Sequence, residues 1–396
     1  MTLEVWLEEL AANQEETLHN RRYLHAHPEL SFEEKATSAF IIEQLQSYGV
    51  EEIYPNAGNG YGIVAKIKGG HPGKTIALRA DFDALAITEE TDVPFISQNA
   101  GVMHACGHDI HTAALLSVAR VLQQHRAELH GNVVLIHQNA EEVLPGGAKS
   151  MVEAGALSDV DLVFGIHVHS TLPAGMVGYA ETYATAAADS FTINIQGTGG
   201  HASQPSETSD AIIIASQIIT NLQTLVSRQL NPLEPAVVTF ASVAAGNDAY
   251  NVIADTAEIK GTVRTLEENV RQSFYEKLVQ LSDTIASIQN GRATVDYLFG
   301  YPSVKNTATE VQVLVSVLEA MFGKEKVVKI PVGMGGEDFS YFLNEKPGAF
   351  FIVGGKNDAI NANYPHHHPK FKMDEQCIHQ SGQSFLGLVA KYLLVE

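Results

Sequence analysis

The chain has 396 residues, which is too many for one ordinary hydrophobic core, so its length predicts two or three domains. Its hydrophobic fraction of 45% and charged fraction of 18% are typical of a globular protein. Acidic residues outnumber basic ones by 46 to 25, giving a net charge of −21. This argues against a nucleic-acid or anionic-membrane partner, because phosphate attraction requires positive charge.

Two further sequence features bear on the cellular compartment. No apolar run reaches the ~20 residues that span a bilayer, and residues 2–20 lack the basic start and apolar stretch of a signal peptide. We therefore expect a cytoplasmic protein. The two cysteines, Cys106 and Cys377, form no disulfide framework. In a reducing compartment Cys106 is free to act as a thiolate.

The first part of the chain alternates between strand and helix patterns. Ser31-Phe32-Glu33-Glu34 reads as a capping box that opens a helix ending near Gly49. Short apolar runs at 63–67, 75–78, 133–136 and 162–166 predict strands, and 112–122 is apolar at helical spacing. This alternation predicts an α/β fold with a helix-flanked, mostly parallel sheet.

The pattern changes after about residue 186. Strands are predicted at 191–195, 237–242, 257–266 and 294–298, with helices at 210–225 and 267–288. The order βαββαβ is that of a ferredoxin-like α+β domain. A helix at 311–322 and a strand at 350–353 then resume the first pattern. We expect a catalytic domain in two parts, 1–185 and 301–396, interrupted by an inserted domain at 186–300 that can hinge as a lid.

Potential metal ligands are concentrated in one nonapeptide, Met103 to His111, which precedes a predicted helix. Its Cys106 and His108 offer thiolate and imidazole, the natural donors for zinc and its neighbours. A loop with a buried cysteine and capping polar groups would have the same sequence. The nonapeptide alone leaves the two interpretations equal.

Other donors follow predicted strands. Glu141 and Glu142 come after 133–136, His167 and His169 follow 162–166, and His366 to His368 lie near the C-terminus. Each group alone could be a solvated polar edge. Together they favour a ligand site at the carboxyl edge of the sheet, where α/β proteins bind their ligands.

The chain resembles the M20 metallopeptidase family, in the amidohydrolase branch that includes N-acyl amino acid hydrolases and auxin-conjugate hydrolases. The matching segments run in the family's order and cover nearly the whole chain. They are 78–85 (LRADFDAL), 103–111 (MHACGHDIH), 138–142 (QNAEE), 165–168 (GIHV), 199–202 (GGHA), 335–339 (GGEDF) and 367–371 (HHPKF).

The resemblance implies a centre of two divalent metal ions, with zinc or manganese first and cobalt or nickel as alternatives. The ligands it implies are Cys106, His108, Glu142, His167 and His367. Cys106 stands where related peptidases carry a bridging aspartate, so we expect its sulfur to contact both metals. Glu141 is then the general base, which takes a proton from the attacking water and delivers it to the leaving amine.

Further roles also follow from the resemblance. His201 would stabilise the oxyanion; in dimeric relatives this histidine comes from the partner subunit, so a homodimer through the inserted domain is expected. Asn251 and Arg264 fall at positions near substrate, although a surface arginine on a strand fits Arg264 as well. Asp83 and Asp109 would orient a ligand imidazole.

Some positions depart from the family's pattern without removing a ligand or the base. His137 and Asn139 replace the usual Phe and Pro before the paired glutamates, and Ala254 replaces a usual Pro. His137 could add a donor to the pocket. The histidine run 366–368 leaves a one-residue ambiguity, and we choose His367 because the family's ligand precedes the proline by two.

Three functions remain in competition. The first is hydrolysis of N-acyl-L-amino acids, with an N-acetyl or aromatic acyl group, to a carboxylate and a free amino acid. The second keeps the chemistry but makes the protein a dipeptidase or carboxypeptidase. The third is a non-catalytic protein that binds metal or an acyl amino acid, which the complete set of ligands and base disfavours.

Overall fold

The computed structural model describes residues 2–394, which form two compact units. The first contains the chain up to Ala184, Val304–Val332 and the chain from Asp338 onward; the second contains Thr185–Ser303 and Gly333–Glu337. The short segment 333–337 lies inside the range expected for the catalytic domain, yet it belongs to the second unit. There the backbone N–H of Ala186 donates to the carbonyl of Gly333 at 2.9 Å.

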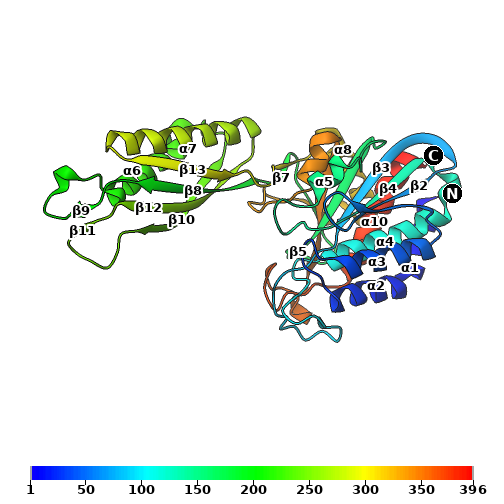
Figure 1. Cartoon of the computed structure of the whole chain (residues 1–396). Helices are drawn as coiled ribbons and strands as arrows, with labels where there is room; N and C mark the ends of the chain where they lie inside the picture. The colour runs from blue at the N-terminus through cyan, green and yellow to red at the C-terminus, as the bar shows by residue number, and fades with distance from the viewer. Residues whose placement is uncertain (1, 395–396) are drawn as a thin grey trace. The chain divides into compact units, whose positions relative to one another are not determined.

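The first unit is built on a large mixed sheet (Figure 1). Within the described residues, four neighbouring strand pairs are parallel and three antiparallel, which confirms the mostly parallel α/β prediction. In spatial order the strands are β1 (Glu52–Ala57), β2 (Gly62–Lys68), β4 (His130–Gln138), β3 (His71–Asp81), β5 (Leu162–Pro173), β16 (Gly348–Lys356), β6 (Val177–Tyr179) and β15 (Val327–Lys329).

Both faces of this sheet are buried, as its continuous apolar strands require. Successive residues of β3 enter different cores: Ile76 and Leu78 belong to one, and Ala77 to the other. The larger core includes residues of α1 (Leu3–Ala12), α2 (Gln14–Ala26), α3 (Lys35–Ser47), α4 (His108–Gln124), α8 (Ala308–Phe322) and α10 (Gln376–Leu393). The smaller core includes residues of α5 (Ala148–Glu153) and α9 (Ser340–Glu345). Two short strands, β7 (Tyr183–Thr185) and β14 (Val304–Lys305), pair with each other.

The start of α3 differs from the prediction. The hydroxyl of Ser31 donates to Asp83 Oδ2 at 2.7 Å rather than capping the helix. The carboxylate of Glu34 accepts from the N–H of Ala140. Glu29 provides the cap instead, because its two oxygens accept the N–H groups of Ala36 and Thr37 at 3.1 and 2.7 Å. The capping box was therefore wrong, because tertiary partners claim both of its side chains.

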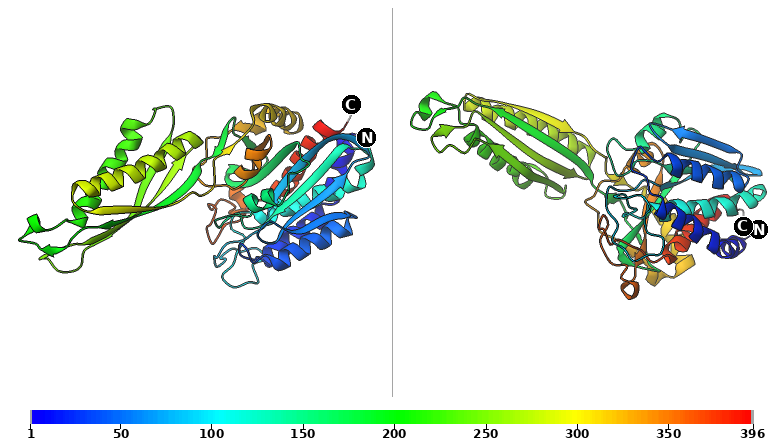
Figure 2. Two further views of the ribbon diagram at one scale, coloured as in Figure 1. Left: turned by 45° about the horizontal axis from the view of Figure 1, so that its top comes forward. Right: turned by 60° about the horizontal axis from the view of Figure 1, so that its bottom comes forward.

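The second unit is an open sandwich with the predicted βαββαβ order (Figures 1 and 2). All its neighbouring strands are antiparallel in the order β10-β12-β8-β13. Its core joins this sheet to two helices through residues such as Ile193, Ile218 and Phe274. The elements are β8 (Ala187–Gln196), α6 (Ala211–Thr224), β10 (Ala236–Ala245), β12 (Thr256–Thr265), α7 (Glu268–Ile288) and β13 (Arg292–Leu298), with a separate pair β9 (Gly200–His201) and β11 (Val252–Ile253).

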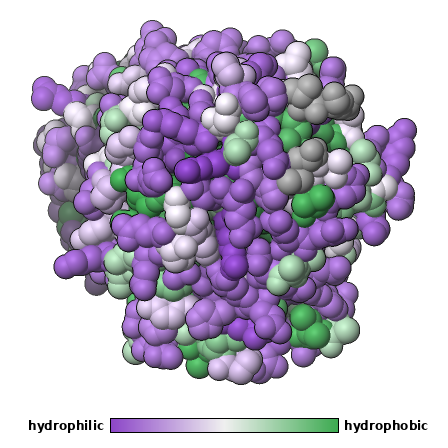
Figure 3. All heavy atoms as spheres, turned by 90° about the vertical axis from the view of Figure 1, so that its right-hand side faces the viewer, coloured by the Kyte–Doolittle hydropathy of each residue, from purple (hydrophilic) through white to green (hydrophobic). Residues whose placement is uncertain are grey.

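The surface has the hydrophilic character that a globular composition predicts. The face seen in Figure 3 is mostly hydrophilic, and its hydrophobic residues occur in small groups between hydrophilic ones. Across residues 2–394, no helix combines the length and the apolar character needed to cross a membrane.

Candidate metal centre

The predicted donors of the first unit lie at the carboxyl edge of three parallel strands. In the strand register, Asp81 at the end of β3 is level with Gln138 at the end of β4. Arg79 is level with Gly165, so His167 of β5 lies at the same height as Asp81. Glu141 and Glu142 follow β4 directly. Parallel pairing therefore brings groups that are distant in sequence to one edge.

The loop Cys106-Gly107-His108 approaches this edge closely. Gly107 has φ of 99°, and a Cβ there would lie 2.4 Å from Cγ2 of Val168 in β5. Only glycine accepts both the backbone angle and the contact. Helix α4 begins at His108, so its first turn carries His108 and His111 on one face.

The five expected ligands face one another. Cys106 Sγ lies 3.4 Å from His167 Nε2, and Glu142 Oε1 lies 3.3 Å from His367 Nε2 and 3.8 Å from His108 Nε2. Donor atoms that lie within 4.8 Å of one another form two groups that share the cysteine. One is Cys106, His108 and His167, and the other is Cys106, Glu142 and His367. A third such group contains Glu141, beside His108 and Glu142.

The electrostatics of this cluster suit a cation. Burial, with Glu142 and Glu141 nearby, raises the pKa of the Cys106 thiol well above its usual range, so a thiolate requires added positive charge. Burial opposes a charged His108, but Asp81, Asp83 and Glu142 outweigh it and raise the pKa of His108 to about 10. Nε2 of His108 is buried without a hydrogen-bond partner among residues 2–394. Thiolate, imidazole and carboxylate donors in an acidic, buried setting fit transition-metal ions.

Asp83 contacts the expected ligand His108. Its Oδ1 lies 3.1 Å from His108 Nδ1, and its Oδ2 accepts the backbone N–H of Glu142 at 3.0 Å. The Nδ1 of His108 is also 3.0 Å from the Asp83 carbonyl. With Nδ1 donating, Nε2 is left free to bind a metal.

Asp109 does something different from the expected role. Its Oδ2 is 2.8 Å from Nδ1 of His25 and 3.0 Å from Nε of Arg21, both in α2. Asp109 therefore orients His25, not a ligand imidazole. The first turn of α4 directs its side chain away from that of His108 and towards α2.

A buried ion-pair network beneath the ligands was not foreseen. Arg79 donates to Asp81 Oδ2 at 2.7 Å and to Asp338 Oδ1 at 3.0 Å. Asp81 Oδ1 lies 2.5 Å from His111 Nδ1, and the other ring nitrogen of His111 accepts the N–H of Val168 at 2.8 Å. His111 thus ties α4 to β5 beside His167. The motif 78–85 contained Arg79 and Asp81, but Asp338, the second carboxylate that Arg79 binds, lies 259 residues further along the chain than Arg79.

The structure also separates the ambiguous histidines. His367 contacts Glu142, whereas His366 Nδ1 lies 3.6 Å from Cys106 Sγ. His137 is fully buried, 3.2 Å from the Thr112 hydroxyl, and burial lowers its pKa to about 3. The suggestion that His137 is an additional pocket donor stays a prediction.

The other expected residues lie in the second unit. His201 and Asn251 adjoin through the β9–β11 pair, where Asn251 O accepts from Ala202 N. Arg264 is at the far end of β12, and its guanidinium donates to the carbonyls of Met334, Asp189 and Val263. These contacts hold the segment 333–337 and favour the strand-surface interpretation of Arg264.

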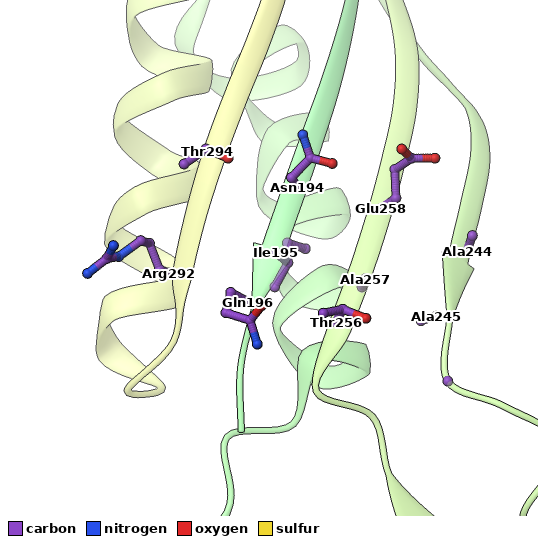
Figure 4. A pocket seen from close by; sticks show the side chains of 11 residues that line it. Asn194, Ile195, Gln196, Ala244, Ala245, Thr256, Ala257, Glu258, Arg292 and Thr294 are labelled. Carbon is purple, nitrogen blue, oxygen red and sulfur yellow. The ribbon is translucent and has the colours of Figure 1, made fainter. Parts of the chain in front are cut away.

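The second unit also has a hollow of about 550 Å³ over its sheet. Figure 4 shows side chains of β8, β12 and β13 around it, among them Asn194, Glu258 and Arg292. These are the outward-facing polar residues of alternating strands. The hollow holds none of the residues expected for catalysis.

A buried cluster of thiol, imidazole and carboxylate groups at the carboxyl edge of an α/β sheet, with a further carboxylate beside it, is typical of metal-dependent hydrolases. The model of a family described as Peptidase family M20/M25/M40 matches residues 77–391, and the chain belongs to this family. It is a hydrolase that acts on amide bonds, as predicted.

Similar proteins include both kinds of activity weighed above. An N-acyl-L-amino acid amidohydrolase of Geobacillus stearothermophilus is 43% identical over 286 residues, 72% of this chain and 76% of that protein. Thermostable carboxypeptidase 1 of Saccharolobus solfataricus is 38% identical over 374 residues, 94% of each chain. The crystal structure of the Bacillus subtilis YXEP protein, described as a dinuclear metal binding peptidase from the M20 family, matches with a TM-score of 0.83 and 36% identity, over 96% of this chain and 98% of that one.

Proposed function

We propose that this protein hydrolyses the amide bond of N-acyl-L-amino acids, with an N-acetyl or aromatic acyl group, to a carboxylate and a free amino acid. The observation that carries the proposal is the pair of donor groups sharing Cys106, with Glu141 in a third group next to Glu142. Such an arrangement leaves one carboxylate for proton transfer once the ligands are assigned.

Five side chains would hold two divalent ions, with zinc or manganese first and cobalt or nickel as alternatives. They are Cys106, His108, Glu142, His167 and His367. When bound, such ions polarise a carbonyl group and lower the pKa of water towards ~7. Asp83 keeps the His108 ring in the orientation that directs Nε2 at the cluster.

The remaining steps belong to side chains of the protein. Glu141, which is 7% exposed, takes a proton from the attacking water and delivers it to the leaving amine. In the second unit, exposed His201 supplies a hydrogen bond to the developing oxyanion, and Asn251 contacts substrate. The Nδ1 of His201 accepts from Ser203, which leaves Nε2–H to donate.

Replacing the base tests the proposal directly. Glu141→Gln keeps the shape but cannot accept a proton, so kcat for N-acetyl and N-benzoyl amino acids should fall roughly 10²- to 10⁴-fold. Metal content, measured on the same samples, should stay at two ions per chain. The matched control is Glu153→Gln, an exposed carboxylate on α5, which should hydrolyse at the wild-type rate. Near-normal turnover by metal-loaded Glu141→Gln would contradict Glu141 as the general base.

The second candidate is a dipeptidase or carboxypeptidase, which the similarity to a thermostable carboxypeptidase favours. A dipeptide carries a free α-amine that requires an acidic partner near the metals. Comparing kcat/KM for dipeptides, N-blocked peptides and N-acyl amino acids decides between the two. The N-acyl proposal predicts that a free α-amine lowers kcat/KM.

We further propose a homodimer through the inserted domain and a cytoplasmic location. The β9–β11 end of this domain exposes apolar side chains, among them Val252 and the fully exposed Tyr250 beside Asn251.

The two free cysteines suit the reducing environment of the cytoplasm. The acidic charge disfavours nucleic acid and anionic membranes as partners, leaving a small molecule as the expected one. Analytical sedimentation tests the homodimer, and cell fractionation tests the cytoplasmic location.

A further inference from the structure

His366 occupies a defined position between β5 and the cysteine loop. Its Nδ1 is 3.6 Å from Cys106 Sγ, and its Nε2 is 3.2 Å from the backbone nitrogen of Ser170. The ring packs edge-on to His167 at 5.3 Å between centroids, and lies 4.9 Å from both His169 and Phe371. Contacts on several sides fix the orientation of the ring.

The hydrogen bond with the Ser170 backbone determines which nitrogen of the His366 ring carries the proton. The N–H of Ser170 can only donate, so Nε2 of His366 accepts and carries no proton. A neutral imidazole then has its proton on Nδ1, the nitrogen that faces Cys106 Sγ. A separation of 3.6 Å suits a hydrogen bond from N–H to sulfur, since sulfur is larger than oxygen.

We propose that His366 is a positioning residue that donates a hydrogen bond from Nδ1–H to the sulfur of Cys106 and so orients the metal-binding thiolate. This inference rests on the proposed role of Cys106 as a ligand. A hydrogen bond to a thiolate withdraws electron density from sulfur, which tunes its bond to a metal. His366 thereby acts on the metals through Cys106, while its neighbour His367 acts as a ligand.

Cobalt-loaded protein gives a readout that does not depend on turnover. A thiolate ligand produces a sulfur-to-cobalt charge-transfer band in the near ultraviolet. The hydrogen bond lowers the energy of the sulfur lone pairs, so its loss in His366→Leu should move the band to longer wavelength. The same variant should change the Co²⁺ dissociation constant roughly 10- to 100-fold, as losses of such outer partners do.

Two further variants complete the test. His366→Asn places an amide N–H near the position of Nδ1 and should keep the band close to that of the wild type. His368→Leu is the matched control from the same loop, because its ring stacks on Tyr364 and accepts from Lys370 N instead. It should leave the band unchanged, and circular dichroism checks that each variant is folded.

The outcomes distinguish the role of His366 from that of Cys106. If folded His366→Leu has its charge-transfer band at the wild-type wavelength and binds cobalt with unchanged affinity, the role of His366 alone is overturned. A wild-type protein that binds cobalt without a charge-transfer band overturns Cys106 as a ligand, and the inference with it. A shift in His366→Leu that His366→Asn reverses supports the hydrogen bond.

Discussion

At the scale of single residues, the carboxyl edge of the sheet concentrates charge in a buried space. Arg79 is completely buried, and it binds Asp81, Asp338 and the side-chain oxygen of Gln138. Charges removed from water require such partners, because an unpaired ion in the interior is costly. The network keeps Asp81 ionised where it orients His111, next to the expected ligands.

Removing the cation from this network should be strongly destabilising. Arg79→Met fills most of the volume but removes the positive charge that pairs with the buried carboxylates of Asp81 and Asp338, so the free energy of unfolding should fall by about 3–5 kcal/mol. Urea denaturation measures it. Arg126→Met is the control, an exposed arginine 4.0 Å from exposed Glu51, where the loss should be below about 1 kcal/mol. Equal losses in both variants would contradict the network's importance.

The sequence placed the donors but not all their partners. Cys106, His108, Glu142, His167 and His367 could be selected through the family motifs. Two contacts could not be predicted, because each joins segments that are far apart in sequence: that of His25 with Asp109 and that of His366 with Cys106. Neither pair has a local spacing that marks it.

At the scale of elements, period and composition predicted all six elements of the βαββαβ sandwich in the second unit. In the first unit they predicted only part of the structure, namely β2, β3, β4, β5, β16, α3, α4 and α8. Ends were less predictable: β5 continues from the predicted 162–166 to Pro173, where it pairs with β16. Helices α1, α2, α5, α9 and α10 were not predicted, although Trp6 and Leu10 of α1 are in the larger core. A short amphipathic helix such as α1 has few apolar positions. These positions become part of a core only because α1 packs on α10 and α4.

The start of α3 gives a testable contrast between motif and structure. Glu29→Ala removes the acceptor for the N–H groups of Ala36 and Thr37, and should lower stability by about 0.5–2 kcal/mol, as the loss of a helix cap does. Glu33→Ala, at an exposed position of the same turn, should change it by less than about 0.5 kcal/mol. Thermal unfolding of the two variants decides; a larger effect at Glu33 would speak against Glu29 as the cap.

At the scale of the whole molecule, one buried histidine joins distant parts of the first unit. His25 of α2 is bound to Asp109 of α4 at 2.8 Å and to Glu89 at 3.1 Å, while Arg21 beside it reaches Glu375 before α10. Burial and the nearby Arg21 oppose the charged ring, but the two carboxylates outweigh them and raise the pKa of His25.

This shift predicts a pH dependence of stability. The folded protein holds the His25 proton more tightly than the unfolded chain, whose pKa is about 6.5. The stabilisation is therefore complete below about pH 6.5 and is lost as pH rises through the higher folded pKa. In His25→Gln the fall in melting temperature between about pH 6.5 and 9 should be smaller than in wild type.

The control for this experiment is His19→Gln, an exposed histidine of the same helix, which should keep the wild-type slope. A His25→Gln slope equal to that of the wild type would show that other groups set the pH dependence.

By itself, the sequence determined the α/β class, the βαββαβ order of the second unit and the family, and it selected the residues proposed as metal donors, because these depend on local periodicity and on contiguous motifs. Only the tertiary structure decided that Glu29 caps α3, that Asp109 serves His25, and that His366 faces the sulfur of Cys106. Each depends on which side chains the fold brings within about 3–4 Å, and hydrogen bonds are decided at that range. Parallel strand register and the close approach at Gly107 set those distances, and neither can be read from one segment alone.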